Sequence, residues 1–245
     1  MGLIDHLTFS LYTNLDVNIH SSLKFGSYDK GAILPGSSIQ YLKTKSRESW
    51  ELRGYAMVVY HSQVATGPTP KVALIEPQLP YLYIPDEDWM SFIDAVLFSY
   101  ESDGVRCSSH YCYFEKRCNE IDTATLQQKQ VRIIVFDEAG TETSSNKFHI
   151  KIGGDKLFIP GGQVGLDDNR CILGAFKQTE GRQDAWYLGN IVLADYYIIF
   201  DMTPMTELQK NFIQVGFAPM NPAGFAYEAY PDRPLPPPRP DMNDD

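Results

Sequence analysis

The chain has 245 residues, of which 43% are apolar, and 31 Asp and Glu outweigh 21 Lys and Arg to give a formal charge of −10. Such a chain can bury the core of one large domain or two small ones, so disorder is not expected. Its acidic background carries no block of basic residues, which makes nucleic acid and anionic membranes poor partners. No apolar run reaches the roughly 20 residues of a membrane span.

The first six residues lack the basic flank and cleavage site of a secretory signal, and this favours an intracellular location. The chain also contains four cysteines. An even number is compatible with two disulfides, which intracellular proteins normally keep reduced. The missing signal therefore points to the inside of the cell, whereas two disulfides would point to an oxidising compartment.

Short apolar stretches with alternating or β-branched patterns predict strands along most of the chain. Charged residues at 45–48 predict a hairpin tip between the strand stretches 38–44 and 50–60. The Gly-Gly pairs at 153–154 and 161–162 predict hairpin turns. The strand stretches are 7–12, 38–44, 50–60, 72–75, 131–136, 148–152, 157–160 and 171–176, and 23–26 ends in a further turn.

One helix is predicted over residues 86–100. Asp86 can cap it, and Pro85 fixes the direction of entry. The helix has apolar residues at i, i+3, i+4, i+7, i+8 and i+11, which is typical of a helix that packs one face on a core. Those residues are Trp89, Phe92, Ile93, Val96, Leu97 and Tyr100.

The longest apolar run, at 185–201, predicts buried strands and contains Gly189. A glycine within a strand pattern marks a place where the chain bends or another backbone comes close. The sequence therefore predicts that a second segment passes against this run.

The cysteine-rich segment leaves two interpretations open. The spacing of Cys107, His110, Cys112 and Cys118 can be written as a zinc site, although it is irregular. In an oxidising environment Cys107 and Cys112 can instead close a small disulfide loop. We expect disulfides or free thiols here, and no metal or other cofactor.

Residues 223–245 form a proline-rich acidic tail. Pro234, Pro237 and Arg239 fit the polyproline pattern with a basic end that SH3-like grooves accept. A solvated tail without a partner is the alternative.

Several of these stretches together resemble the C-terminal lobe of a pepsin-like aspartic protease. The resemblance runs in the correct order over residues 3–220, and it implies an all-β fold with one main helix. It is carried by 9–12, 23–29, 50–52, 187–190, 196–201 and 215–219.

Proteases of this family have two similar β lobes, each contributing one aspartate of an Asp-Thr-Gly loop. The resemblance places that loop at 73–85, against the strand element at Leu188 and Gly189. Glu76, Pro77 and Gln78 stand where the family has Asp-Thr-Gly. The resemblance also implies a disulfide between Cys118 and Cys171.

These replacements remove the chemistry of the loop. The reaction needs two carboxylates that share a proton, and Glu76 sets its carboxyl about an ångström further out, enough to cost about a hundredfold. Pro77 has neither hydroxyl nor N–H. Gln78 adds a Cβ where glycine permits close approach. We therefore expect Glu76 to be a structural or solvated carboxylate.

The sequence thus predicts a single aspartic-protease-like lobe at 1–222, followed by the tail at 223–245. We expect a catalytically inactive lobe that serves as a structural or protein-interaction subunit of a larger assembly, since a lone lobe exposes the apolar face that meets its twin. The alternative is the C-terminal part of an aspartic endopeptidase that pairs with a separate N-terminal lobe.

Overall fold

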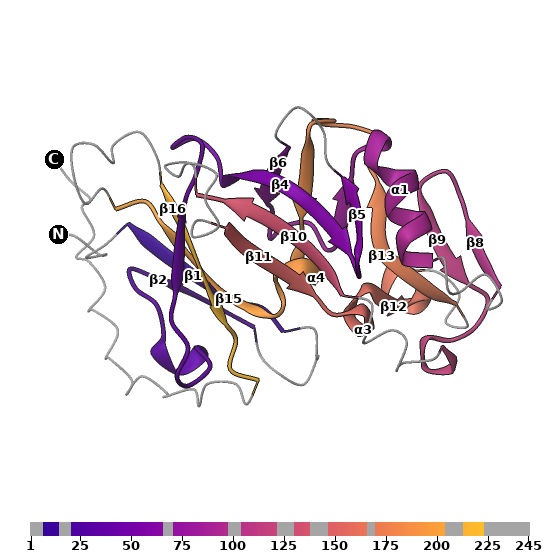
Figure 1. The fold of residues 1–245 in the computed structure, drawn as a ribbon. Helices are drawn as coiled ribbons and strands as arrows, with labels where there is room; N and C mark the ends of the chain where they lie inside the picture. Colours follow the sequence, from indigo (N-terminus) through magenta and orange to yellow (C-terminus); the bar gives the residue numbers. More distant parts are fainter. Residues whose placement is uncertain are drawn as a thin grey trace, which may run out of the picture.

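The structure, a computed structural model, describes residues 7–14, 21–65, 71–97, 104–121, 130–137, 147–165, 170–203 and 213–222. Two β-sheets make up most of it (Figure 1). The all-β fold with one main helix that the sequence predicted is confirmed.

The smaller sheet contains both the first and the last strand of the described chain. β1 pairs with β15 and β2, while β16 links β15 to β3. The strands, in their order across the sheet, are β2 (Ser22–Phe25), β1 (Thr8–Tyr12), β15 (Tyr196–Asp201), β16 (Gln214–Pro219) and β3 (Gln40–Lys43). All its pairings are antiparallel.

The larger sheet has eleven strands and contains two parallel pairings, β6 with β14 and β7 with β13. In order they are β11 (Lys147–Ile152), β10 (Val131–Phe136), β4 (Glu51–Val59), β6 (Val72–Ile75), β14 (Ala185–Leu188), β7 (Leu82–Ile84), β13 (Cys171–Lys177), β9 (Tyr111–Phe114) and β8 (Val105–Cys107). β5 (Ser62–Ala65) pairs with β4, and β12 (Phe158–Pro160) pairs with β13.

The main helix, α1 (Asp86–Leu97), buries the apolar face expected from its sequence and packs against β4 and β5. The last three residues of the predicted helix lie outside the described residues. Within the described segments, the other helical pieces are single turns: α3 (Gly154–Leu157), α4 (Asn190–Leu193), and the 3-10 turns η1 (Lys30–Ala32), η3 (Cys118–Glu120) and η5 (Gly161–Val164).

Most buried apolar side chains belong to one core that the two sheets share. Leu42, Val215 and Phe217 of the smaller sheet lie in the same cluster as Trp186 and Phe92. A second, smaller cluster around Tyr12 and Tyr197 lies beneath η1. The described part of the chain therefore folds around a common interior.

Two local predictions are wrong, and one stretch predicted as buried strands contains a helical turn between them. The charged residues at 45–48 do not form a hairpin tip, because β3 and β4 belong to different sheets. The Gly-Gly pairs at 153–154 and 161–162 lead into α3 and η5 rather than into hairpin turns. The run 185–201 is interrupted by α4. In the first case, the partner of β3 is β16, which lies too far away in sequence for a local pattern to reveal.

Candidate functional site

The loop that joins β6 to β7 contains Glu76, Pro77 and Gln78. β14 lies between these two strands, parallel to β6 and antiparallel to β7, so the loop must cross the end of β14. At the start of the loop the Glu76 N–H donates to the Leu188 carbonyl at 3.0 Å, and the Leu79 N–H donates back to the Glu76 carbonyl at 3.0 Å. The backbone of Glu76 is thus tied to both the strand and its own turn.

The second half of the loop is the segment that passes Gly189. Three consecutive N–H groups, those of Gly189, Asn190 and Ile191, donate to the carbonyls of Tyr81, Leu79 and Pro80 at 3.1, 2.8 and 3.0 Å. A Cβ on Gly189 would lie 2.5 Å from the Leu79 carbonyl oxygen and closer still to that of Tyr81. The close neighbour expected beside Gly189 is therefore present, at residues 79–81.

The side chain of Glu76 is half-buried, whereas that of Gln78 is exposed. Burial raises the pKa of the Glu76 carboxyl above its ordinary value, and no neighbouring charge within the described residues contributes to this shift. Glu76 can therefore hold a proton at a higher pH than a solvated glutamate does. Among the residues that the structure describes, no cation pairs with it.

At the other end of β6 from the loop, a buried polar cluster fixes the start of α1. The Trp186 indole N–H donates to Asp88 Oδ2 at 2.8 Å, and Lys71 Nζ lies 3.4 Å from the same oxygen. Lys71 also pairs with Glu87. Lys71 and Asp88 are only 7% and 8% exposed, and the carboxylate lies in the first turn, at the positive end of the helix dipole. This cluster joins α1 to β14 and to the residue that precedes β6.

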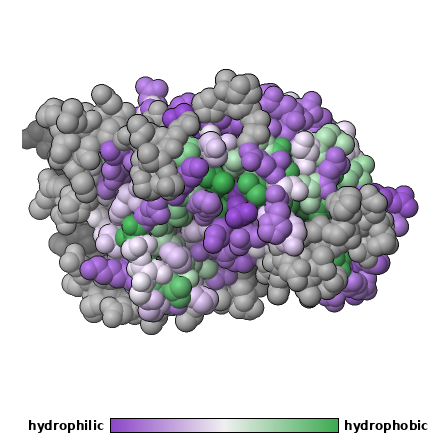
Figure 2. Space-filling view, in the orientation of Figure 1, coloured by the Kyte–Doolittle hydropathy of each residue, from purple (hydrophilic) through white to green (hydrophobic). Residues whose placement is uncertain are grey.

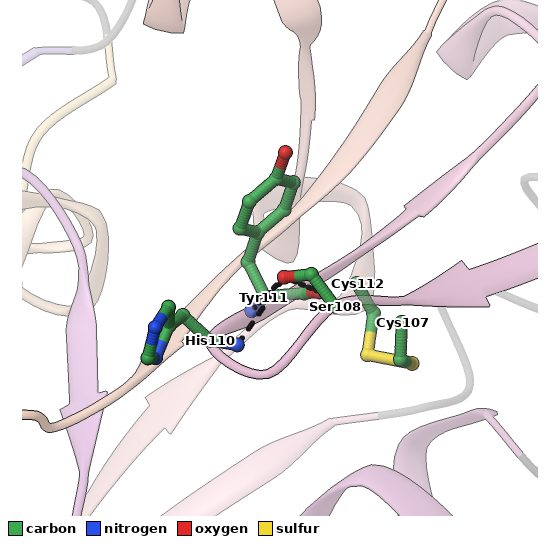
Figure 3. The surroundings of a disulfide bond; sticks show 5 residues. All are labelled: Cys107, Ser108, His110, Tyr111 and Cys112. Atoms are coloured by element: carbon green, nitrogen blue, oxygen red, sulfur yellow. Dashed lines mark hydrogen bonds between the residues drawn. A yellow bond between two sulfur atoms is a disulfide. The ribbon is translucent and has the colours of Figure 1, made fainter.

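Both cysteine pairs are disulfides. Cys118 and Cys171 join η3 to β13, and Cys107 and Cys112 lie opposite each other across the β8–β9 hairpin. Figure 3 shows the hairpin tip, where the Tyr111 ring points away from the sulfur atoms and Ser108 accepts hydrogen bonds from the N–H groups of His110 and Tyr111.

These bonds use all three sulfurs of the candidate zinc site, those of Cys107, Cys112 and Cys118. No group of His, Cys, Asp or Glu suited to a metal is found among the described residues. Two disulfides are typical of an oxidising compartment, so the intracellular location stays a prediction.

The remaining predicted site residues, Pro234, Pro237 and Arg239, lie outside the described residues. Two groups of charged side chains were not predicted from the sequence. One is the buried pair of Lys71 and Asp88, and the other is a row of basic residues on β11. In the second case the alternation of Lys147, His149 and Lys151 with apolar residues could have revealed it.

A strand inserted between the two arms of a loop, beside a helix and an antiparallel second sheet, defines the lobe type of the pepsin-like proteases. A family model described as eukaryotic aspartyl protease matches residues 1–210. The chain belongs to the eukaryotic aspartyl protease family. A search of the curated proteins finds no match, and no helix within the described segments is long and apolar enough to cross a membrane.

Proposed function

We propose that this chain is a catalytically inactive aspartic-protease-like lobe that serves as a structural or protein-interaction subunit of a larger assembly. The observation that carries the proposal is the loop at Glu76. A half-buried carboxyl followed by proline and glutamine offers neither the hydroxyl nor the tight backbone of the family's Asp-Thr-Gly, and no charge in the described part of the chain contributes to the pKa of Glu76. We infer that the loop, which crosses the end of β14, no longer supplies the chemistry of an Asp-Thr-Gly loop.

An exposed apolar face supports a role in binding. Leu7, Leu23 and Phe25 are 56%, 52% and 65% exposed on β2 and at the start of β1. Phe25 lies 6.4 Å from Phe9, which in turn stacks on Phe200 at 4.5 Å. Apolar side chains gathered in this way on an edge strand favour a protein partner.

The alternative function is that of the C-terminal half of an aspartic endopeptidase that pairs with a separate N-terminal lobe. Two observations favour it: the close packing of residues 79–81 on Gly189 is intact, and Glu76 still carries a carboxyl that can hold a proton. In such a pair Glu76 would act opposite an aspartate of the other lobe.

Proteolysis distinguishes the two functions. We expect the chain, purified from its own cells with whatever accompanies it, to leave denatured haemoglobin uncleaved at about pH 4, where carboxyl groups are near their ordinary pKa. A pepstatin-type inhibitor and the variant Glu76→Gln serve as controls. Cleavage that both the inhibitor and this variant abolish would establish the alternative.

The identity of the partner requires a separate experiment. Mass spectrometry of proteins that co-purify with the native chain would show whether a second protease lobe or an unrelated subunit accompanies it. The tail is a further proposed contact, because Pro234, Pro237 and Arg239 fit SH3-like grooves. A synthetic peptide of residues 231–240 should then bind an SH3 domain, and the same peptide with Arg239→Ala should bind it more weakly.

A further inference from the structure

A groove of about 770 Å³ lies between β11, the edge strand of the large sheet, and the segment that leads into β3. Ser37, Ser38 and Gln130 contribute polar groups to its lining, and Lys147, His149 and Lys151 contribute basic ones. β2 lies at the opposite edge of the smaller sheet from β3. The groove is therefore separate from the apolar face around Phe25.

The basic residues form a row because they alternate along one strand. Ile150 and Ile152 are buried in the core, so the odd-numbered residues 147, 149 and 151 face the other way. Arg132 on β10 lies directly opposite Lys151, and Lys147 Nζ stands 4.6 Å over the Tyr55 ring. Figure 2 shows hydrophilic residues over this part of the two strands.

Carboxylates of the described residues do not neutralise the positive charge of this row. Within the described residues, none of Arg132, Lys147, His149 and Lys151 forms an ion pair with a carboxylate, and Asp195, which lines the same groove, is paired with Lys156. Burial, followed by the fields of Arg132, Lys151 and Lys147, lowers the pKa of His149. The net charge of −10 repels anions at long range, but screening over about 8 Å at physiological salt leaves the local cations dominant.

We propose that this groove binds an extended acidic segment of a partner protein, with carboxylates at alternate residues. Alternate side chains on a strand are about 6.7 Å apart, so the row spans about 13 Å. A single small anion reaches one or two of these cations, whereas every second side chain of an extended peptide matches the same spacing. The polar lining provides hydrogen-bond partners for the backbone of the peptide. The proposal holds whether or not the lobe is catalytic.

Fluorescence anisotropy with a labelled peptide of alternating Glu and Ala tests the proposal, with a Gln and Ala peptide as the control. Two partly exposed ion pairs, with Lys147 and Lys151, predict about fivefold tighter binding of the Glu peptide. The double variant Lys147→Gln with Lys151→Gln should lose most of this difference. The matched variant Lys30→Gln with Lys45→Gln, which removes the same charge from exposed lysines outside the groove, should keep it.

A second measurement follows His149 itself. The bound carboxylates favour the imidazolium form, so the peptide should raise the pKa of His149 in NMR titration, and binding should strengthen as the pH falls through that pKa. Besides the cations on β10 and β11, the groups that line this groove include Asp195 and Tyr196. The linkage should disappear with the Gln peptide.

Four outcomes would overturn the proposal. The Glu and Gln peptides could bind equally, or the two double variants could bind the Glu peptide equally. Inorganic phosphate could compete as well as the peptide does, which would show a site for small anions. Finally, the Glu peptide could bind only to a chain that is shortened to end after Pro222. That result would show that residues 223–245, rather than a partner, occupy the groove.

Discussion

Gly189 is the residue on which the geometry of the loop depends most directly. Gly189→Ala would drive a Cβ into the carbonyl oxygens of Leu79 and Tyr81, and backbone atoms cannot move aside as a flexible side chain can. We expect a loss of about 1–3 kcal/mol or more in unfolding free energy, measured by urea denaturation. Gly216→Ala is the comparison. There the new Cβ meets the side chains of Tyr41 and Ile39, and an equal or larger loss in that variant would contradict the argument.

Glu76 should make the stability of the protein depend on pH. Because burial raises the pKa of this carboxyl in the folded state, the folded chain binds more protons than the unfolded chain between the two pKa values. Stability therefore falls as the pH rises through that window. We expect the unfolding free energy of the wild type, minus that of Glu76→Gln, to decrease above about pH 4 and then to level off once the folded-state pKa is passed.

Thermal unfolding of both proteins across this pH range provides the measurement. Glu48→Gln is a matched control on an exposed carboxyl. A difference curve for Glu76→Gln that rises with pH, or one that matches the Glu48→Gln curve, would show that burial of Glu76 has no effect on stability.

Among the elements, α1 depends on the buried contact between Asp88, Lys71 and Trp186. Asp88→Ala removes the acceptor of the Trp186 N–H and one carboxylate beside a buried ammonium group. Breaking such a contact from one side costs about 3–5 kcal/mol. Asp88→Asn keeps an acceptor and should cost less. Asp94→Asn, on the exposed side of α1, should change stability by about 0.5 kcal/mol or less.

The double variant Lys71→Met with Asp88→Leu shows whether charge or packing at this contact contributes more to the stability of the protein. Replacing a buried pair by apolar groups of similar size is often neutral or stabilising. The double variant should therefore be more stable in chemical denaturation than Asp88→Ala alone. If it is less stable, the ion pair itself stabilises α1.

The sequence predicted elements whose signal is local. Trp89, Phe92 and Val96 mark one face of a helix by their spacing alone, and the strand limits at 72–75 and 131–136 follow from their apolar composition. The strand with which β3 pairs could not be predicted, because its pairing with β16 joins residues about 170 positions apart. α4 was missed because Asn190–Leu193 continues an apolar run that is equally compatible with a strand.

For the site, only the backbone arrangement could be predicted from the sequence, and not the burial or pairing of its side chains. Gly189 predicted that another backbone segment lies close by, and the resemblance identified the loop that contains this segment. The burial of Lys71 beside Asp88 left no comparable signal, since a lysine next to a proline-rich loop is ordinarily a surface residue. The basic row on β11 was visible as alternation, but the absence of carboxylate partners within the described residues is a property of the fold.

At the scale of the whole molecule, the smaller sheet is where the lobe should meet its partner. Leu23 and Phe25 are exposed on its edge strand β2, and burying such side chains typically contributes about 1.5–3 kcal/mol each. We expect Leu23→Ser with Phe25→Ser to remove a co-purifying protein without lowering the melting temperature, because neither side chain is buried in the lobe itself. Quantitative mass spectrometry of tagged chains expressed in their own cells measures this loss.

The control for this surface is Met90→Ser on α1. Met90 is 62% exposed, much like Phe25, but it lies on the helix rather than on the sheet edge. If exposed apolar area alone retained partners, the Met90 variant would lose them too. Since an edge strand also presents unpaired backbone groups to an incoming strand, we expect the loss to be confined to the β2 variant. An unchanged set of partners in that variant would place the interface elsewhere.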